Sequence, residues 1–136
     1  MKVFLGGTCN GSPWRENLIA KLKVDYFNPV VDSWGEEDRK IELHERKNAD
    51  YCLYVITPLM EGVYSIAELV DDSNKRPKKT LLCIIDEDKN EETLKLAKFS
   101  NHEIKYLRAV QKLVQANGVK VFNNLDDVAD FLNSYV

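Results

Sequence analysis

Two glutamates with a tyrosine between them form the grouping in this chain most suited to chemistry. Glu61 and Glu68 flank Tyr64 near the start of a helix predicted over residues 63–74. At about 100° per residue, Tyr64, Ser65 and Glu68 project from one face of that helix, and Glu61 returns to nearly the same azimuth. Such a pair of carboxylates is able to supply a nucleophile and a proton donor.

The same periodicity assigns the two faces of this helix. Its apolar face is predicted to comprise Val63, Ile66, Ala67 and Val70, and the acidic face is predicted to point away from the core. Because the helix follows an apolar strand, the acids gather at the strand's carboxyl end, where open parallel sheets bind ligands. An ordinary solvated helix face is the alternative interpretation of the same pattern.

Apolar runs and amphipathic segments alternate along the whole chain. The pattern predicts strands over 2–7, 26–31, 51–57, 80–86 and 119–122, and helices over 13–23, 35–49, 63–74, 125–135 and, as one or two helices, 91–117. Near-continuous apolar strands separated by helices indicate a parallel sheet covered on both faces. We therefore expect one doubly wound α/β domain over 1–136, flavodoxin-like or Rossmann-like, with five strands in the order 2-1-3-4-5.

Composition restricts the possible partners. With 19 basic and 22 acidic residues among 136, the chain has no general basic surface, so a small ligand is expected and nucleic acid is not. Cys52 and Cys83 lie in apolar runs and are predicted to be buried thiols, and no cysteine spacing indicates a metal or a disulfide framework. No signal peptide or long apolar span is evident, which predicts a cytoplasmic protein without membrane contact.

The loop after the first strand is a candidate contact for substrate. Its residues 6–12 join a strand to a helix, so the N–H groups around Gly7 and Thr8 are placed to hold a phosphate or a sugar hydroxyl. Arg15 could pair with a 5′-phosphate or simply be solvated. Cys9 admits a catalytic thiol, although neither histidine has a spacing that suggests a Cys–His pair.

Two further residues follow the second predicted strand. Trp34 is placed to stack on a planar ring and Asp32 to bond its edge, both at the carboxyl side of the sheet. Covering a helix–sheet junction is the alternative role for Trp34. Charges alternate along the next helix, with Glu42 one turn before Arg46, which predicts a solvated face.

Three stretches of the chain resemble a known family. KVFLGGTCNGSPWR, DYFNPVVDSW and NADYCLYVITPLMEGVYSIAE are similar to the small, 2-deoxyribosyltransferase-like branch of the nucleoside 2-deoxyribosyltransferase superfamily, over roughly residues 2–86. The resemblance implies an enzyme for nucleoside or nucleotide N-glycosidic bonds that needs no cofactor. It implies that Glu68 attacks the anomeric carbon of the sugar, and that neighbouring subunits of a homo-oligomer complete the pocket.

The chain also departs from the family pattern. The better-known transferases carry an aspartate six residues before the nucleophile, whereas Glu61 lies seven before Glu68, and they place an aromatic hydroxyl where this chain has Gly6, Gly7 and Thr8. Tyr64 is a candidate to replace that hydroxyl by orienting the Glu68 carboxylate, or else a packing residue. A deoxyribosyltransferase or N-glycosidase is therefore the leading hypothesis. A non-catalytic nucleotide-binding protein is the alternative, and a flavodoxin-like interaction module is a third interpretation.

Overall fold

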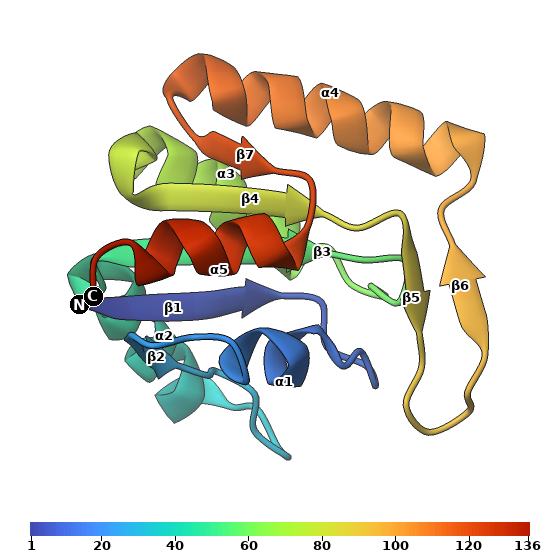
Figure 1. Ribbon diagram of the computed structural model, residues 1–136, viewed down its shortest axis with the longest axis horizontal. Helices are drawn as coiled ribbons and strands as arrows, with labels where there is room; N and C mark the ends of the chain where they lie inside the picture. Colours follow the sequence, from blue (N-terminus) through green and yellow to red (C-terminus); the bar gives the residue numbers. More distant parts are fainter.

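The computed structural model describes residues 1–136 and confirms the predicted fold class (Figure 1). Five parallel strands form one sheet in the order β2-β1-β3-β4-β7. They are β1 (Lys2–Gly7), β2 (Asp25–Phe27), β3 (Tyr51–Ile56), β4 (Thr80–Ile84) and β7 (Lys120–Phe122). Because β7 is the fifth strand of this sheet in chain order, the arrangement is the predicted 2-1-3-4-5.

Helices cover both faces of the sheet, as a doubly wound fold requires. The helices α1 (Trp14–Ile19) and α5 (Leu125–Asn133) lie on one face, and α2 (Glu36–Asn48), α3 (Tyr64–Lys75) and α4 (Asn101–Asn117) on the other (Figure 1). Alternate side chains of each strand point into two separate hydrophobic cores, one on each face of the sheet. Leu5, Leu53 and Leu81 pack toward α1 and α5, whereas Phe4, Tyr54 and Leu82 pack toward α3 and α4.

The second strand is shorter than predicted. It ends at Phe27 instead of continuing to residue 31. Pro29 has no N–H to donate to a neighbouring strand, and the side chain of Asn28 accepts the N–H of Val30 at 3.1 Å, which turns the chain away from the sheet. The segment 28–34 is consequently free to form one wall of a cavity.

A hairpin replaces the first part of the helical region predicted over 91–117. Strands β5 (Glu87–Lys89) and β6 (Leu96–Lys98) pair antiparallel beyond the carboxyl ends of the main strands (Figure 1). The side chain of Asn90 closes the connection by accepting the N–H groups of Glu92 and Thr93. The hairpin also holds the loop after β1, since the N–H of Glu91 donates to the carbonyl of Gly11 at 3.0 Å.

A single long helix follows the hairpin. Ser100 and Glu103 cap its start reciprocally, each side chain accepting the other residue's N–H, and Gly118 ends it in a left-handed conformation with φ 112°. Of the one or two helices predicted over 91–117, the structure therefore has one, α4, which begins at Asn101. None of the helices combines the length and the hydrophobicity that a membrane-spanning segment requires.

The predicted faces of α3 are partly wrong. Val63 is 73% exposed and Ala67 is also exposed, whereas Glu68 and Asp72 are buried. Hydrophobic periodicity does not anticipate buried carboxylates, because burial of a charge is costly unless partners stabilise it. Here Arg46 from α2 supplies a partner for Asp72.

Candidate functional site

A cavity of about 630 Å³ lies at the carboxyl end of the sheet, beside the point where the strand order reverses between β1 and β3. It draws on four parts of the chain: β1 and its following loop, the start of α1, the segment after β2 with α2, and the first turns of α3. The lining residues are Phe4, Gly6, Gly7, Cys9, Arg15, Pro29, Val30, Val31, Trp34, Glu42, Tyr64, Ser65 and Glu68. The volume suits one drug-sized molecule.

Gly7 forms the floor of this cavity and must be glycine. Its φ is +124°, and a Cβ atom placed there would lie 2.1 Å from the carbonyl oxygen of Val55. The chain therefore passes β3 too closely for any side chain. Thr8, which follows, is buried and its hydroxyl accepts the N–H of Thr57 at 2.9 Å. Thr8 thus fixes the loop to β3 and does not line the main cavity.

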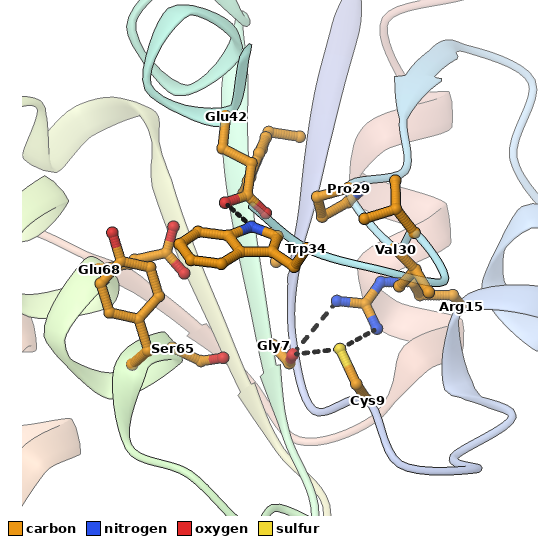
Figure 2. Close-up of a pocket in the computed structure, with 13 residues that line it drawn as sticks. Gly7, Cys9, Arg15, Pro29, Val30, Trp34, Glu42, Ser65 and Glu68 are labelled. Atoms are coloured by element: carbon orange, nitrogen blue, oxygen red, sulfur yellow. Dashed lines mark hydrogen bonds between the residues drawn. The ribbon is translucent and has the colours of Figure 1, made fainter. Parts of the chain in front are cut away.

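Arg15 is buried beneath the cavity, where its hydrogen bonds hold β1 and the loop after it in place. Its guanidinium donates to three backbone carbonyls, those of Leu5 at 3.0 Å, Thr8 at 2.7 Å and Gly7 at 3.2 Å. Its Nη1 also lies 3.8 Å from the sulfur of Cys9, and Figure 2 shows the contacts of Arg15 with Gly7 and Cys9. It is 6% exposed, so the solvated alternative is wrong. Since most of its N–H groups are engaged, little donor capacity is left for a ligand phosphate.

Trp34 and Glu42 are joined by a hydrogen bond at one side of the cavity. The indole Nε1 of Trp34 donates to Oε2 of Glu42 at 2.9 Å (Figure 2). Trp34 is half exposed and packs edge to face against Tyr64, with ring centroids 6.1 Å apart. Partial burial raises the pKa of the Glu42 carboxyl, which the Trp34 hydrogen bond opposes. An aromatic ring and an acid therefore share one side of the cavity.

Glu68 is the most unusual residue of the site. It is 8% exposed, and its Oε2 is the only buried side-chain oxygen or nitrogen without a hydrogen-bond partner. The nearest cation is Arg46, whose Nη1 lies 3.7 Å from that oxygen. Buried polar atoms are almost always satisfied, and Glu68 also lines the cavity, so its carboxyl group is a candidate contact for a ligand.

Burial raises the pKa of Glu68 to about 7. Desolvation is the largest cause; Arg46 lowers the pKa, while Glu42 and Asp72 raise it further. Glu68 lies in the second turn of α3, where the helix dipole favours the ionised form of a carboxyl group. Loss of hydration outweighs that effect, so the carboxyl titrates near neutral pH.

Replacing Glu68 with glutamine should stabilise the protein at alkaline pH. The folded-state pKa of about 7 lies above the ordinary value of 4.5, so wild type loses stability as pH rises through this window. At pH 8 we expect Glu68→Gln to be more stable by about 3 kcal/mol, and below a pH of about 4.5 the difference should vanish. Urea unfolding at both pH values measures this. Glu61→Gln, at an exposed position, is the control; a pH-independent difference for Glu68→Gln would contradict the prediction.

Glu61 lies outside the main cavity. Its expected helical alignment with Glu68 is wrong, because α3 begins at Tyr64 and Glu61 belongs to the preceding loop. It lines a second hollow of about 120 Å³, next to Thr8 and Asn10. Asp32 is exposed and lines neither space. Of the candidate residues, Glu68, Tyr64, Ser65, Gly7 and Trp34 do come together around the main cavity.

Two residues of the site were missed by sequence reasoning. Glu42 and Arg46 were assigned to a solvated helix face, but Glu42 lines the cavity and Arg46 is 4% exposed. One signal was available: α3 carries acids at Glu68 and Asp72, one turn apart. If that face were buried it would require a cation, and Arg46 at the end of the preceding helix is a natural source.

The fold and the site together define a class of protein: a doubly wound α/β domain with a ligand cavity at its topological switch point and a buried carboxylate facing that cavity. The chain belongs to the nucleoside 2-deoxyribosyltransferase-like family, whose model matches residues 1–87. That match contains all the residues that line the cavity. No curated protein sequence matches the chain significantly.

Proposed function

We propose that the protein cleaves the N-glycosidic bond of 2′-deoxynucleosides through a glycosyl-enzyme on Glu68. The observation that carries this proposal is the unpartnered, buried Oε2 of Glu68 at a cavity of nucleoside size. A carboxylate poorly solvated in this way is a stronger nucleophile than one in water, because no hydrogen bond has to break before it attacks. Family membership supports the same chemistry.

The first half-reaction needs only groups present at the site. The ionised Glu68 carboxylate forms a bond to C1′ of the sugar while the C1′–N bond breaks, and the electron pair of that bond goes to the departing base. The second half-reaction transfers the sugar to water, giving hydrolysis, or to another base, giving transfer. Both outcomes restore the free Glu68 carboxylate.

Glu42 is the better candidate for the acid that assists the departing base. It shares the cavity with Glu68, whereas Glu61 does not. Its hydrogen bond to Trp34 places it beside the aromatic side of the cavity, where a base would stack. Burial raises its pKa, which favours the protonated form that a proton donor needs.

We expect Glu42→Gln to slow release of ordinary bases by about 10²–10⁴-fold, because the base would have to leave without a proton. The effect should shrink to less than about tenfold with 7-methyl-2′-deoxyguanosine, whose base departs as a neutral molecule without protonation. Chromatography of the free base measures both rates. An equal loss with both substrates would show that Glu42 acts in binding and not as the acid.

The charges of the site favour nucleosides over nucleotides. Glu42 and Glu68 line the main cavity and Glu61 lines the smaller hollow, whereas Arg15 is the only cationic residue and is engaged with backbone carbonyls. A 5′-phosphate would lie among like charges without a free cation.

Matched pairs of 2′-deoxynucleosides and their 5′-monophosphates test the proposed function. We expect base release from the nucleosides, with kcat/KM at least about tenfold lower for the monophosphates, as unpaired like charges predict. Adding a second base distinguishes transfer from hydrolysis. If no substrate releases a base while a nucleoside or nucleotide still binds in calorimetry, the protein is a binding module and the enzymatic proposal is wrong.

A further inference from the structure

A buried ion network lies directly behind Glu68 and takes no part in the chemistry described above. Arg46 of α2 forms a two-point contact with Asp72 of α3, through Nε at 3.2 Å and Nη2 at 2.8 Å. Asp72 is fully buried and also accepts hydrogen bonds from Tyr54 and Arg76. Charged groups buried to this degree are costly in free energy, which favours a role beyond packing.

The partners of Arg46 explain why Glu68 keeps a free oxygen. Its Nε and Nη2 donate only to Asp71 and Asp72, which leaves Nη1 as the group that faces Glu68. Nη1 lies 3.7 Å from Oε2, a distance that is too long for a hydrogen bond but short enough for substantial attraction between charges.

From this geometry we infer that Arg46 is a positioning residue for Glu68, and that Asp72 holds it at this distance. The inference rests on the proposed function, in which Glu68 is the nucleophile. Arg46 supplies positive charge that supports the ionised carboxylate, while its commitment to Asp72 prevents it from occupying the lone pairs that must reach the anomeric carbon. Asp72 therefore keeps the Glu68 carboxylate free to react, because it competes with Glu68 for the N–H groups of Arg46.

The two partners should affect the titration of Glu68 in opposite directions. Removing the positive charge with Arg46→Met leaves the carboxylate with less support, so its pKa should rise. Removing the negative charge with Asp72→Asn frees Arg46 to approach Glu68 and also removes a repulsive charge, so the pKa should fall. The other charged or titratable groups around Glu68 are Arg15, Glu42, Cys9 and Tyr64, and these are unchanged in both variants.

A carboxyl NMR titration with ¹³C-labelled glutamate tests the inference without relying on activity. The Glu68 signal is assigned by its loss in Glu68→Gln. Relative to wild type, we expect the midpoint to rise by about one pH unit in Arg46→Met and to fall by about one unit in Asp72→Asn. Asp71→Asn is the matched control, because Asp71 is a half-exposed partner of Arg46; its shift should be less than half as large. Midpoints that are unchanged, or that move in the same direction, would overturn the inference.

Activity measurements separate this inference from the proposed function. In Asp72→Asn we expect kcat to fall at least tenfold with little change in KM, because a hydrogen bond from Arg46 would now occupy Oε2. Should Arg46→Met fail to fold, Arg46→Lys keeps the positive charge without the planar two-point contact and should raise the midpoint by a smaller amount. If wild type releases no base while the midpoints of the Arg46 and Asp72 variants still shift in opposite directions, only the nucleophilic role of Glu68 is ruled out. If the Arg46 and Asp72 variants keep normal activity and an unchanged Glu68 midpoint, only the positioning role of Arg46 is ruled out.

Discussion

Glu68→Gln should reduce the rate of base release by about 10⁴-fold or more, because an amide cannot form the glycosyl ester that the mechanism requires. The substitution keeps the size and shape of the side chain and removes the charge that burial disfavours, so the fold should be retained. Single-turnover assays with a 2′-deoxynucleoside measure the loss. Circular dichroism and the unfolding midpoint establish that the variant is folded.

Glu61→Gln provides the contrast for this result. Glu61 is exposed in a loop and lines only the smaller hollow, so its replacement should change the rate by less than about tenfold. A large loss in Glu61→Gln together with a small loss in Glu68→Gln would reverse the roles assigned to the two glutamates. It would also favour the original sequence interpretation of Glu61 as a chemically active acid.

Gly7→Ala should cause the largest loss of stability among single substitutions at the site. A methyl group at this position would lie 2.1 Å from the carbonyl oxygen of Val55, on a residue whose φ is +124°. Steric overlap and backbone strain together should cost about 3–5 kcal/mol of unfolding free energy. The strand pairing between β1 and β3 at this point cannot relax without distorting the sheet. Urea denaturation of the purified variant measures the effect.

Gly62→Ala is the matched control for backbone effects. No atom beyond its immediate chain neighbours lies within 4 Å of the position of its Cβ atom, and its φ lies outside the left-handed region. We therefore expect a change in unfolding free energy within about 0.5 kcal/mol. If Gly7→Ala were as well tolerated as Gly62→Ala, the close approach of the loop to β3 would be wrong, and with it the floor of the cavity.

The fold could be predicted because its strands carry a strong local signal. Continuous apolar runs such as 51–57 and 80–86 are typical of strands in a sheet that is covered on both faces. The helices between these strands favour parallel pairing. The hairpin β5–β6 could not be predicted in the same way. Its strands are three residues long and mostly exposed, so no apolar periodicity marks them.

The site was predicted less completely than the fold. Glu68 and Tyr64 follow from the position of α3 after β3, which sequence patterning locates well. The positions of Glu42 and Arg46 depend on how α2 rotates against α3, and the pattern of α2 alone, with charges on every side, does not indicate that rotation. The second carboxylate was consequently assigned to Glu61, which is near Glu68 in sequence, and not to Glu42, which lines the same cavity.

Assembly into a homo-oligomer stays a prediction. Val30, Val31 and Trp34 are about half exposed at the mouth of the cavity. A neighbouring subunit that covered them would exclude water from the site, as the family resemblance implies. Light scattering at micromolar concentration would reveal such an assembly, and a monomeric mass would contradict it.

The covalent role of Glu68 is tested most directly by trapping the glycosyl-enzyme. A 2′-fluoro-2′-deoxynucleoside carries an electron-withdrawing substituent that slows both formation and breakdown of the intermediate, and intact-mass spectrometry after acid quenching detects any bound sugar. We predict one sugar adduct in wild type, located on Glu68 by peptide mapping, and none in Glu68→Gln. An adduct on another residue, or rapid base release from natural nucleosides with no adduct at any time, would contradict the mechanism.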